Sequence, residues 1–205
     1  GGFRVAFAAL AVLPSLGLWW ARRVPAERVM PVASAARSRS SWELLHTPGL
    51  RRLLAVNWLL SASWDAHSFI VPVLGHERGF SASAIGLVLG VFATAVTGVR
   101  ALIPTLAHRL REQQVLFGAM LCTAAVFAVY PLVGSAWTMG ACATALGLAL
   151  GSVQPMIMST LHQLTPPDRH GEAIAIRSMT INFSSSVMPL AFGAAGTALG
   201  PGVLF

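Results

Sequence analysis

The chain has 205 residues, of which 55% are hydrophobic and only 10% are charged, whereas soluble domains carry roughly 25% charged residues. This composition indicates a membrane protein and excludes an ordinary soluble domain. The net charge of +7 comes from arginines in short runs between apolar blocks, so it indicates membrane topology and no nucleic acid partner.

Six apolar stretches are long enough to cross a bilayer, since a spanning helix needs about 20 mostly apolar residues. They cover residues 3–21, 53–74, 83–106, 115–133, 137–161 and 173–195. The sequence therefore predicts an all-α, polytopic membrane helix bundle with six transmembrane helices. Because the chain begins and ends within apolar runs and lacks an initial methionine, we expect it to be a fragment of a longer protein.

The first connection, residues 22–52, is the only long one. Its Ala, Ser, Pro and Arg content predicts a flexible linker, and its end, in SWELLHTPGLRRLL, predicts an amphipathic pre-helix at the membrane surface. Most arginines lie in the connections after the first, third and fifth stretches, namely Arg22, Arg23, Arg28, Arg37, Arg39, Arg51, Arg52, Arg109, Arg111 and Arg169. The opposite side has only Arg4 and Arg78. Because cytoplasmic loops are enriched in arginine, the linker is predicted to be cytoplasmic.

Several segments resemble the major facilitator superfamily. An inward-running span, the long arginine-rich linker and then LLHTPGLRRLLAVNW resemble the centre of that family, and RGFSASAIG is similar to the turn between its seventh and eighth helices. The segment GVRALIPTLAHRLREQQVL is similar to its cytoplasmic loop motif at Arg109 but departs from it at His108 and Arg111. In TPPDRHGEAIAI, Arg169 and Gly171 match the loop before the family's eleventh helix.

This resemblance implies that the chain covers helices six to eleven of a twelve-helix transporter built from two halves. Residues 1–21 would be the last helix of the amino-terminal half, and residues 53–205 most of the carboxy-terminal half, truncated before its last helix. The resemblance also implies a substrate site between the halves. The missing amino-terminal half of the same protein would then be a partner, together with the lipid bilayer.

An acidic residue lies near the middle of the second apolar stretch. Asp65 follows Leu53 by about 12 residues, which places it roughly 18 Å into a hydrocarbon core of about 30 Å. Helical spacing puts Asp65 on one polar stripe with Asn57 and Ser61. A carboxylate at this depth costs about 2.5–3.5 kcal/mol. Asp65 is therefore expected either to face a cavity, where it could exchange protons, or to lock two helices by hydrogen bonds.

Two basic side chains lie within predicted spans near this acid. His67 points about 200° around the helix from Asp65, so it is predicted to contact another helix unless a break at Pro72 brings it round to the stripe. Arg100 lies roughly 10 Å deep in the third stretch. It is expected either to snorkel to the cytoplasmic surface or to pair with a carboxylate or an anionic substrate.

The fifth and sixth stretches hold further candidate ligands. Pro155 frees a backbone carbonyl in the fifth stretch, and the neighbouring Gln154 can bind a ligand or compensate for that break. Gly147 and Gly151, four residues apart, predict close helix packing. In the sixth stretch, Asn182 lies at mid-depth and is expected to bind a ligand or to join helices.

The motifs of several enzyme classes are missing from the sequence. The chain has no lysine for a G-x-x-x-x-G-K phosphate loop and no G-x-S-x-G segment, and its histidines lack the spacing of metal ligands. We therefore expect no enzyme activity, metal or cofactor. The prediction is a secondary active transporter that moves a small solute across the bacterial inner membrane by alternating access, with protons coupled through Asp65. The alternative is a membrane sensor or assembly subunit in which Asp65 only locks helices.

The type of substrate is indicated by two opposing sets of residues. Aromatic and methionine side chains within the spans favour a hydrophobic substrate and export; they are Trp58, Trp64, Phe69, Met156, Met158, Met179 and Met188. Arg100 and Arg177, if they face the cavity, favour an anionic metabolite instead.

The predicted orientation can be tested by labelling single cysteines in intact cells. A membrane-impermeant thiol reagent should modify His76→Cys, because the loop at residues 75–81 is predicted to be external. It should not modify Ser38→Cys in the cytoplasmic linker. The reverse pattern would contradict the orientation derived from the arginines.

Overall fold

A computed structural model describes residues 11–12, 14–15, 17–18, 21–23, 41–106 and 111–199, with side chains described up to residue 194. The chain divides into two units, Gly1–Arg39 and Ser40–Phe205. In the first unit the backbone at residues 11–12, 14–15, 17–18 and 21 is helical. Most of the predicted span 3–21 and residues 24–40 of the linker lie outside the described residues.

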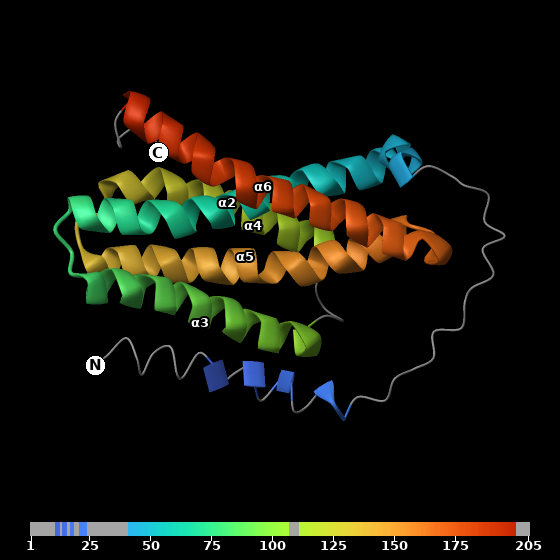
Figure 1. The fold of residues 1–205 in the computed structure, drawn as a ribbon, viewed down its shortest axis with the longest axis horizontal. Coiled ribbons are helices and arrows are strands. Elements are labelled where there is room, and N and C mark those ends of the chain that lie inside the picture. The colour runs from blue at the N-terminus through green and yellow to red at the C-terminus, as the bar shows by residue number, and fades with distance from the viewer. Residues whose placement is uncertain are drawn as a thin grey trace. The chain divides into compact units, whose positions relative to one another are not determined.

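Every secondary-structure element in the described part of the second unit is a helix. In chain order its elements are the 3-10 helix η1 (Ser41–His46), α2 (Pro48–Glu77), α3 (Ala82–Leu106), α4 (Glu112–Val129), the 3-10 helix η3 (Tyr130–Leu132), α5 (Ala136–Leu164), the 3-10 helix η4 (Pro167–Arg169) and α6 (His170–Leu199). The long helices α2 to α6 run back and forth beside one another (Figure 1). The structure therefore confirms the predicted all-α bundle.

Local sequence signals explain where several helices begin. Pro48 is the first residue of α2, where its missing N–H costs no helical hydrogen bond. Gly79 adopts a φ of +71° in the turn after α2, a conformation that favours glycine. Ser81 Oγ then accepts a hydrogen bond of 3.2 Å from the N–H of Ala84 at the start of α3. Ser135 caps α5 in the same way.

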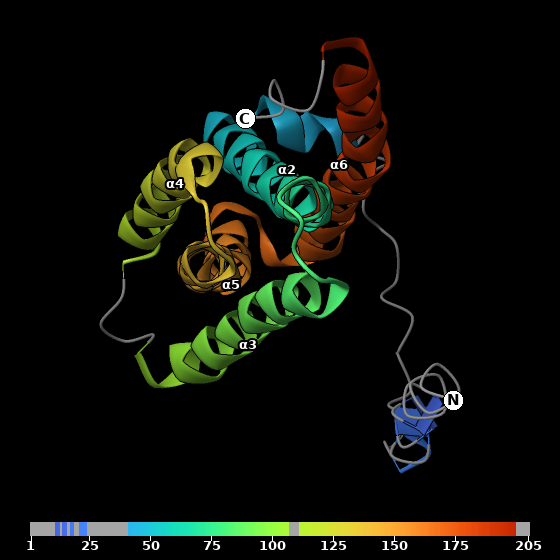
Figure 2. The same ribbon diagram turned by 90° about the vertical axis from the view of Figure 1, so that its left-hand side faces the viewer.

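Helix α5 is the centre of the bundle and contacts the other long helices (Figure 2). Its close approach to α3 depends on two glycines. A Cβ atom at Gly147 would lie 2.6 Å from the carbonyl oxygen of Phe92, and one at Gly151 would lie 2.5 Å from Cγ1 of Val99. These distances leave no room for a side chain, so they confirm the close packing predicted from the glycine spacing.

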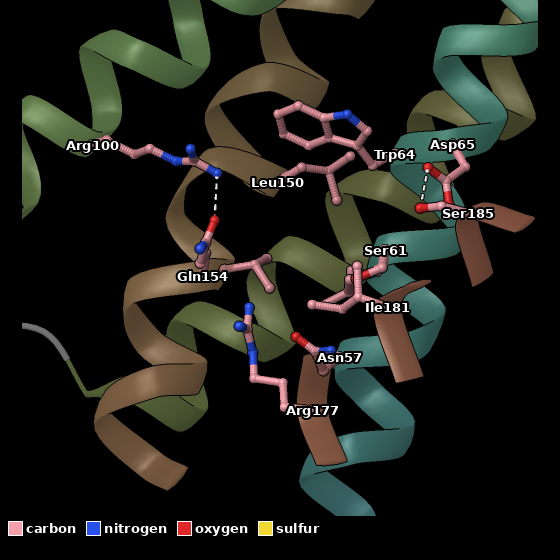
Figure 3. Close-up of a pocket in the computed structure, with 12 residues that line it drawn as sticks. Asn57, Ser61, Trp64, Asp65, Arg100, Leu150, Gln154, Arg177, Ile181 and Ser185 are labelled. Atoms are coloured by element: carbon pink, nitrogen blue, oxygen red, sulfur yellow. Dashed lines mark hydrogen bonds between the residues drawn. The ribbon is translucent and has the colours of Figure 1, made fainter. Parts of the chain in front are cut away.

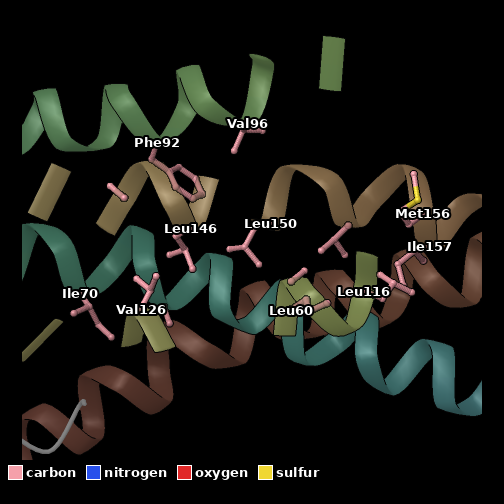
Figure 4. Packing of buried hydrophobic residues seen from close by; sticks show 14 of the residues in the cluster. Leu60, Ile70, Phe92, Val96, Leu116, Val126, Leu146, Leu150, Met156 and Ile157 are labelled. Atoms are coloured by element: carbon pink, nitrogen blue, oxygen red, sulfur yellow. The ribbon is translucent and has the colours of Figure 1, made fainter. Parts of the chain in front are cut away.

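Buried apolar side chains fill the space between the long helices (Figure 4). The cluster includes Leu60, Ile70, Phe92, Val96, Leu116, Val126, Leu146, Leu150, Met156 and Ile157. It joins α2, α3, α4 and α5 into one packed body, against which α6 is held mainly by α2.

Three described helical segments are long and apolar enough to cross a membrane: Ala82–Leu106, Glu112–Leu132 and Ala136–Leu164. Among the described residues, three of the predicted spans, 83–106, 115–133 and 137–161, thus meet both criteria. Helices α2 and α6 are long enough, at 30 residues each, but their polar side chains make them less apolar. The first predicted span, 3–21, lies mostly outside the described residues.

The glycine contact predicts a large effect from a small substitution. Gly147→Ala should lower the free energy of unfolding by about 1–3 kcal/mol, because the new methyl group would press on the backbone of α3. Gly140→Ala on the same helix is the control, since a Cβ there meets nothing within 4 Å. Thermal unfolding of the purified protein in detergent measures both. Equal stability of the two variants would contradict the packing described here.

Candidate functional site

A pocket of about 410 Å³ lies between α2, α3, α5 and α6 (Figure 3). Sites for small molecules usually measure about 300–1,000 Å³, so a small solute fits. The pocket is lined by Asn57, Leu60, Ser61, Trp64, Asp65, Arg100, Leu150, Val153, Gln154, Arg177, Ile181 and Ser185. Its wall thus combines charged and polar groups with an apolar surface.

Most of the candidates chosen from the sequence meet in this pocket. Asn57, Ser61 and Asp65 reach it from α2, where successive helical turns place them on one face. Arg100 reaches it from α3 and Gln154 from α5. The structure therefore brings together polar residues from helices that are far apart in the sequence.

The side chain of Asp65 on α2 contacts α6. Its Oδ2 atom accepts a hydrogen bond of 3.3 Å from Ser184 Oγ, and Ser185 Oγ lies 3.3 Å and 3.2 Å from the two carboxylate oxygens. Ser184 is fully buried, whereas Ser185 lines the pocket. The carboxylate therefore both faces the pocket and joins two helices, so the contacts are compatible with either expectation for Asp65.

Arg100 is held in the pocket by α5. Its Nη2 atom donates to Oε1 of Gln154 at 3.0 Å, and its Nε donates to the carbonyl of Gly151 at 3.4 Å. That carbonyl has no hydrogen-bond partner within the helix, because Pro155, four residues later, has no N–H to donate. The guanidinium carbon also lies 5.8 Å from the ring centroid of Trp64, within the range of a cation–π contact. Gln154 and the break at Pro155 thus fix the position of Arg100.

Two buried polar groups in the pocket wall lack a partner among the described residues. Arg177 is only 8% exposed and Asn57 only 2%. Neither Nε of Arg177 nor Nδ2 of Asn57 has a hydrogen-bond acceptor in the described part of the chain. A buried donor without a partner costs roughly 1–3 kcal/mol, so no contact within the described residues compensates for burying these two donors.

Two of the sequence candidates lie elsewhere. His67 is fully buried; its Nδ1 lies 3.1 Å from Tyr130 Oη, and its ring centroid is 4.3 Å from that of Phe92. His67 therefore contacts other helices, and neither Pro72 nor any other break turns it toward the pocket. Asn182 is exposed on α6 and does not line the pocket.

Ser185 and Tyr130 were not among the site candidates chosen from the sequence, and Arg177 was named there only as a residue that would favour an anion if it faced the cavity. Tyr130 contacts His67 outside the pocket, and as the only tyrosine, next to a proline in an apolar segment, it could have been singled out from the sequence. The position of Arg177 within an apolar stretch did not show which way it faces. Ser185 belongs to a run of three serines, and only the packing of α6 distinguishes it from Ser186.

The predicted loop motif lies at another site, beside the end of the linker. Arg169 is buried and donates to Oε2 of Glu172 at 2.7 Å and 3.1 Å, and it pairs with Glu43 of η1 at 3.5 Å. The hydrogen bond to Glu172 raises the pKa of Arg169, which therefore stays charged. Gly171 is exposed at the start of α6, and Arg109 lies outside the described residues. These contacts attach the pre-helix to the start of α6.

Comparison with known protein families gives a match over most of the chain. The chain matches the family model described as Major Facilitator Superfamily over residues 1–189. The matched region includes every residue that lines the pocket. No curated protein and no solved structure matches the chain.

Access of water to the pocket can be tested with two neighbouring serines. In a variant with Cys122 and Cys142 replaced by alanine, Ser185→Cys should react rapidly with a charged thiol reagent because Ser185 lines the pocket. Ser184→Cys should react at least about tenfold more slowly, since Ser184 is fully buried. Equal reaction rates at the two positions would show that the pocket is not placed as described.

Proposed function

Since the chain belongs to the major facilitator superfamily of membrane transporters, we propose that it moves a small solute by alternating access, as a secondary active transporter. The observation that carries this proposal is a solute-sized pocket, within an apolar bundle, lined by Asp65, Arg100 and Arg177. Ionisable residues within membrane helices are costly and usually mark a functional pathway. Members of this family are transporters and not typically enzymes.

We further propose that α2 and α6 also cross the membrane, which would give the six spans expected from the sequence. At 30 residues each, they are about 45 Å long, more than a hydrocarbon core requires. Asn57, Ser61 and Asp65 of α2 line the pocket, as do Arg177 and Ser185 of α6, so these groups need not contact lipid. In the proposed topology the linker is cytoplasmic, the membrane is the bacterial inner membrane, and the missing amino-terminal half completes the cavity.

Asp65 is proposed as the residue that couples transport to protons. A coupling acid must be stable both with and without its proton. A serine hydroxyl can donate to a carboxylate and can accept from a carboxylic acid, so Ser184 and Ser185 suit both forms of Asp65. The pocket exposes the carboxylate to any solvent that enters, which gives the proton a route to it.

Two other expectations from the sequence have less support. A sensor or assembly subunit with Asp65 as a helix lock would fit the serine contacts, but it would not require the unpartnered Arg177 and Asn57 in the same pocket. Export was expected from aromatic and methionine residues, and of these only Trp64 lines the pocket. The charged lining residues Asp65, Arg100 and Arg177 favour a solute that carries a charge.

The coupling role can be tested with Asp65→Asn in the complete protein. Asparagine keeps an oxygen that can accept from the serines, but it cannot carry a proton across the membrane. In proteoliposomes, accumulation driven by a pH gradient should be lost, while exchange of labelled for unlabelled solute should persist.

His67→Gln is the matched control, because His67 lies outside the pocket and glutamine can still bond to Tyr130. This variant should keep gradient-driven accumulation. Near-normal accumulation by Asp65→Asn would rule out Asp65 as the coupling residue and leave it as a helix lock.

A further inference from the structure

We propose that the pocket binds the carboxylate of an organic anion between Arg100 and Arg177. The anion would be the transported solute, so its transport rests on the proposed function, whereas its binding does not. Among the described lining residues, two arginines face one acidic group, Asp65. The charge of the pocket is therefore positive, which favours an anion.

Arg177 carries most of this inference. Its guanidinium is buried and stays charged, since an arginine does not lose its proton in proteins. Burying a charge without a counter-ion costs several kcal/mol. Arg177 forms no ion pair with any described residue, so no carboxylate of the described part of the chain compensates its charge. A bound carboxylate would supply the missing counter-ion to this guanidinium group, which lines the pocket.

Arg100 provides the second half of the binding site. In Figure 3 the guanidinium groups of Arg100 and Arg177 lie on either side of Gln154. Arg100 uses Nε and Nη2 for its bonds to α5, which fix its orientation and leave Nη1 for a ligand. Two guanidinium groups in one pocket wall, of which Arg100 is fixed in orientation, suit the two oxygens of a carboxylate.

The remaining wall indicates what the rest of the ligand is like. Its apolar part is formed by Leu60, Trp64, Leu150, Val153 and Ile181. An inorganic anion would leave this surface and most of the 410 Å³ unused. A carboxylate that carries an aromatic or aliphatic body would bury these side chains and gain about 25 cal/mol for each Å² of apolar surface removed from water.

Binding of the anion and protonation of Asp65 would favour each other. The charged groups that line the pocket with Asp65 are Arg100 from α3 and Arg177 from α6, whereas α5 contributes the uncharged Gln154. A proton on Asp65 removes the negative charge from the wall, so an anion binds more tightly. By linkage, the bound anion favours the protonated acid to the same extent. This sign of coupling suits uptake of an anion together with a proton.

Equilibrium binding to the complete, purified protein in detergent tests the proposal. Benzoate, phenylacetate and hexanoate are compared with their primary amides, which have nearly the same shape but no charge. At least one carboxylate should bind about tenfold or more tightly than its amide, as expected for charge-assisted hydrogen bonds to arginine. Arg177→Gln should abolish this preference. Arg52→Gln, which removes an exposed charge from α2, should keep the preference for the carboxylate.

The comparison of acid with amide uses the unaltered protein, so it stands even if Arg177→Gln folds poorly. If no carboxylate binds more tightly than its amide, or if a well-folded Arg177→Gln keeps the preference, the proposal is overturned. Selective binding without gradient-driven accumulation of any solute would instead refute the transport function and leave the anion site intact. Accumulation of an uncharged solute by a protein that shows no preference for carboxylates would refute the anion site and leave the transport function intact.

Discussion

The close contact between α3 and α5 across Gly147 and Gly151 determines the geometry of the pocket. Because these positions have no side chains, the backbone of α3 lies directly against α5. This contact brings Arg100 beside the carbonyl of Gly151, which Pro155 leaves without a helical partner. A larger residue at either glycine would move Arg100 away from this carbonyl and open the pocket wall.

The polar residues that line the pocket explain why α2 and α6 are less apolar than the three helices that meet the criteria for a membrane span. Asp65 and Asn57 of α2 and Arg177 of α6 all line the pocket. In a bilayer these side chains must face one another or water, because an isolated charge in hydrocarbon is costly. Low apolarity is therefore the result of building a polar site inside the bundle, with α2 and α6 joined at Asp65 and its two serines.

The sequence predicted the parts of the site that depend on one helix alone. The spacing of Asn57, Ser61 and Asp65 places them on one face of any α-helix, and Pro155 frees a carbonyl wherever α5 packs. The partners of these residues depend on how different helices pack together, which one sequence does not show. The predicted depth of Arg177 and Asn182 in the membrane did not show which of them faces the pocket. In the structure Arg177 lines the pocket and Asn182 does not.

We propose that a proton site and an anion site share one pocket and strengthen each other. The most direct measurement is the number of protons taken up when benzoate binds to the complete, purified protein in weakly buffered solution. Binding should be accompanied by net proton uptake, and Asp65→Asn should bind benzoate without it. Binding to the unaltered protein with no proton uptake would contradict the coupling of the two sites.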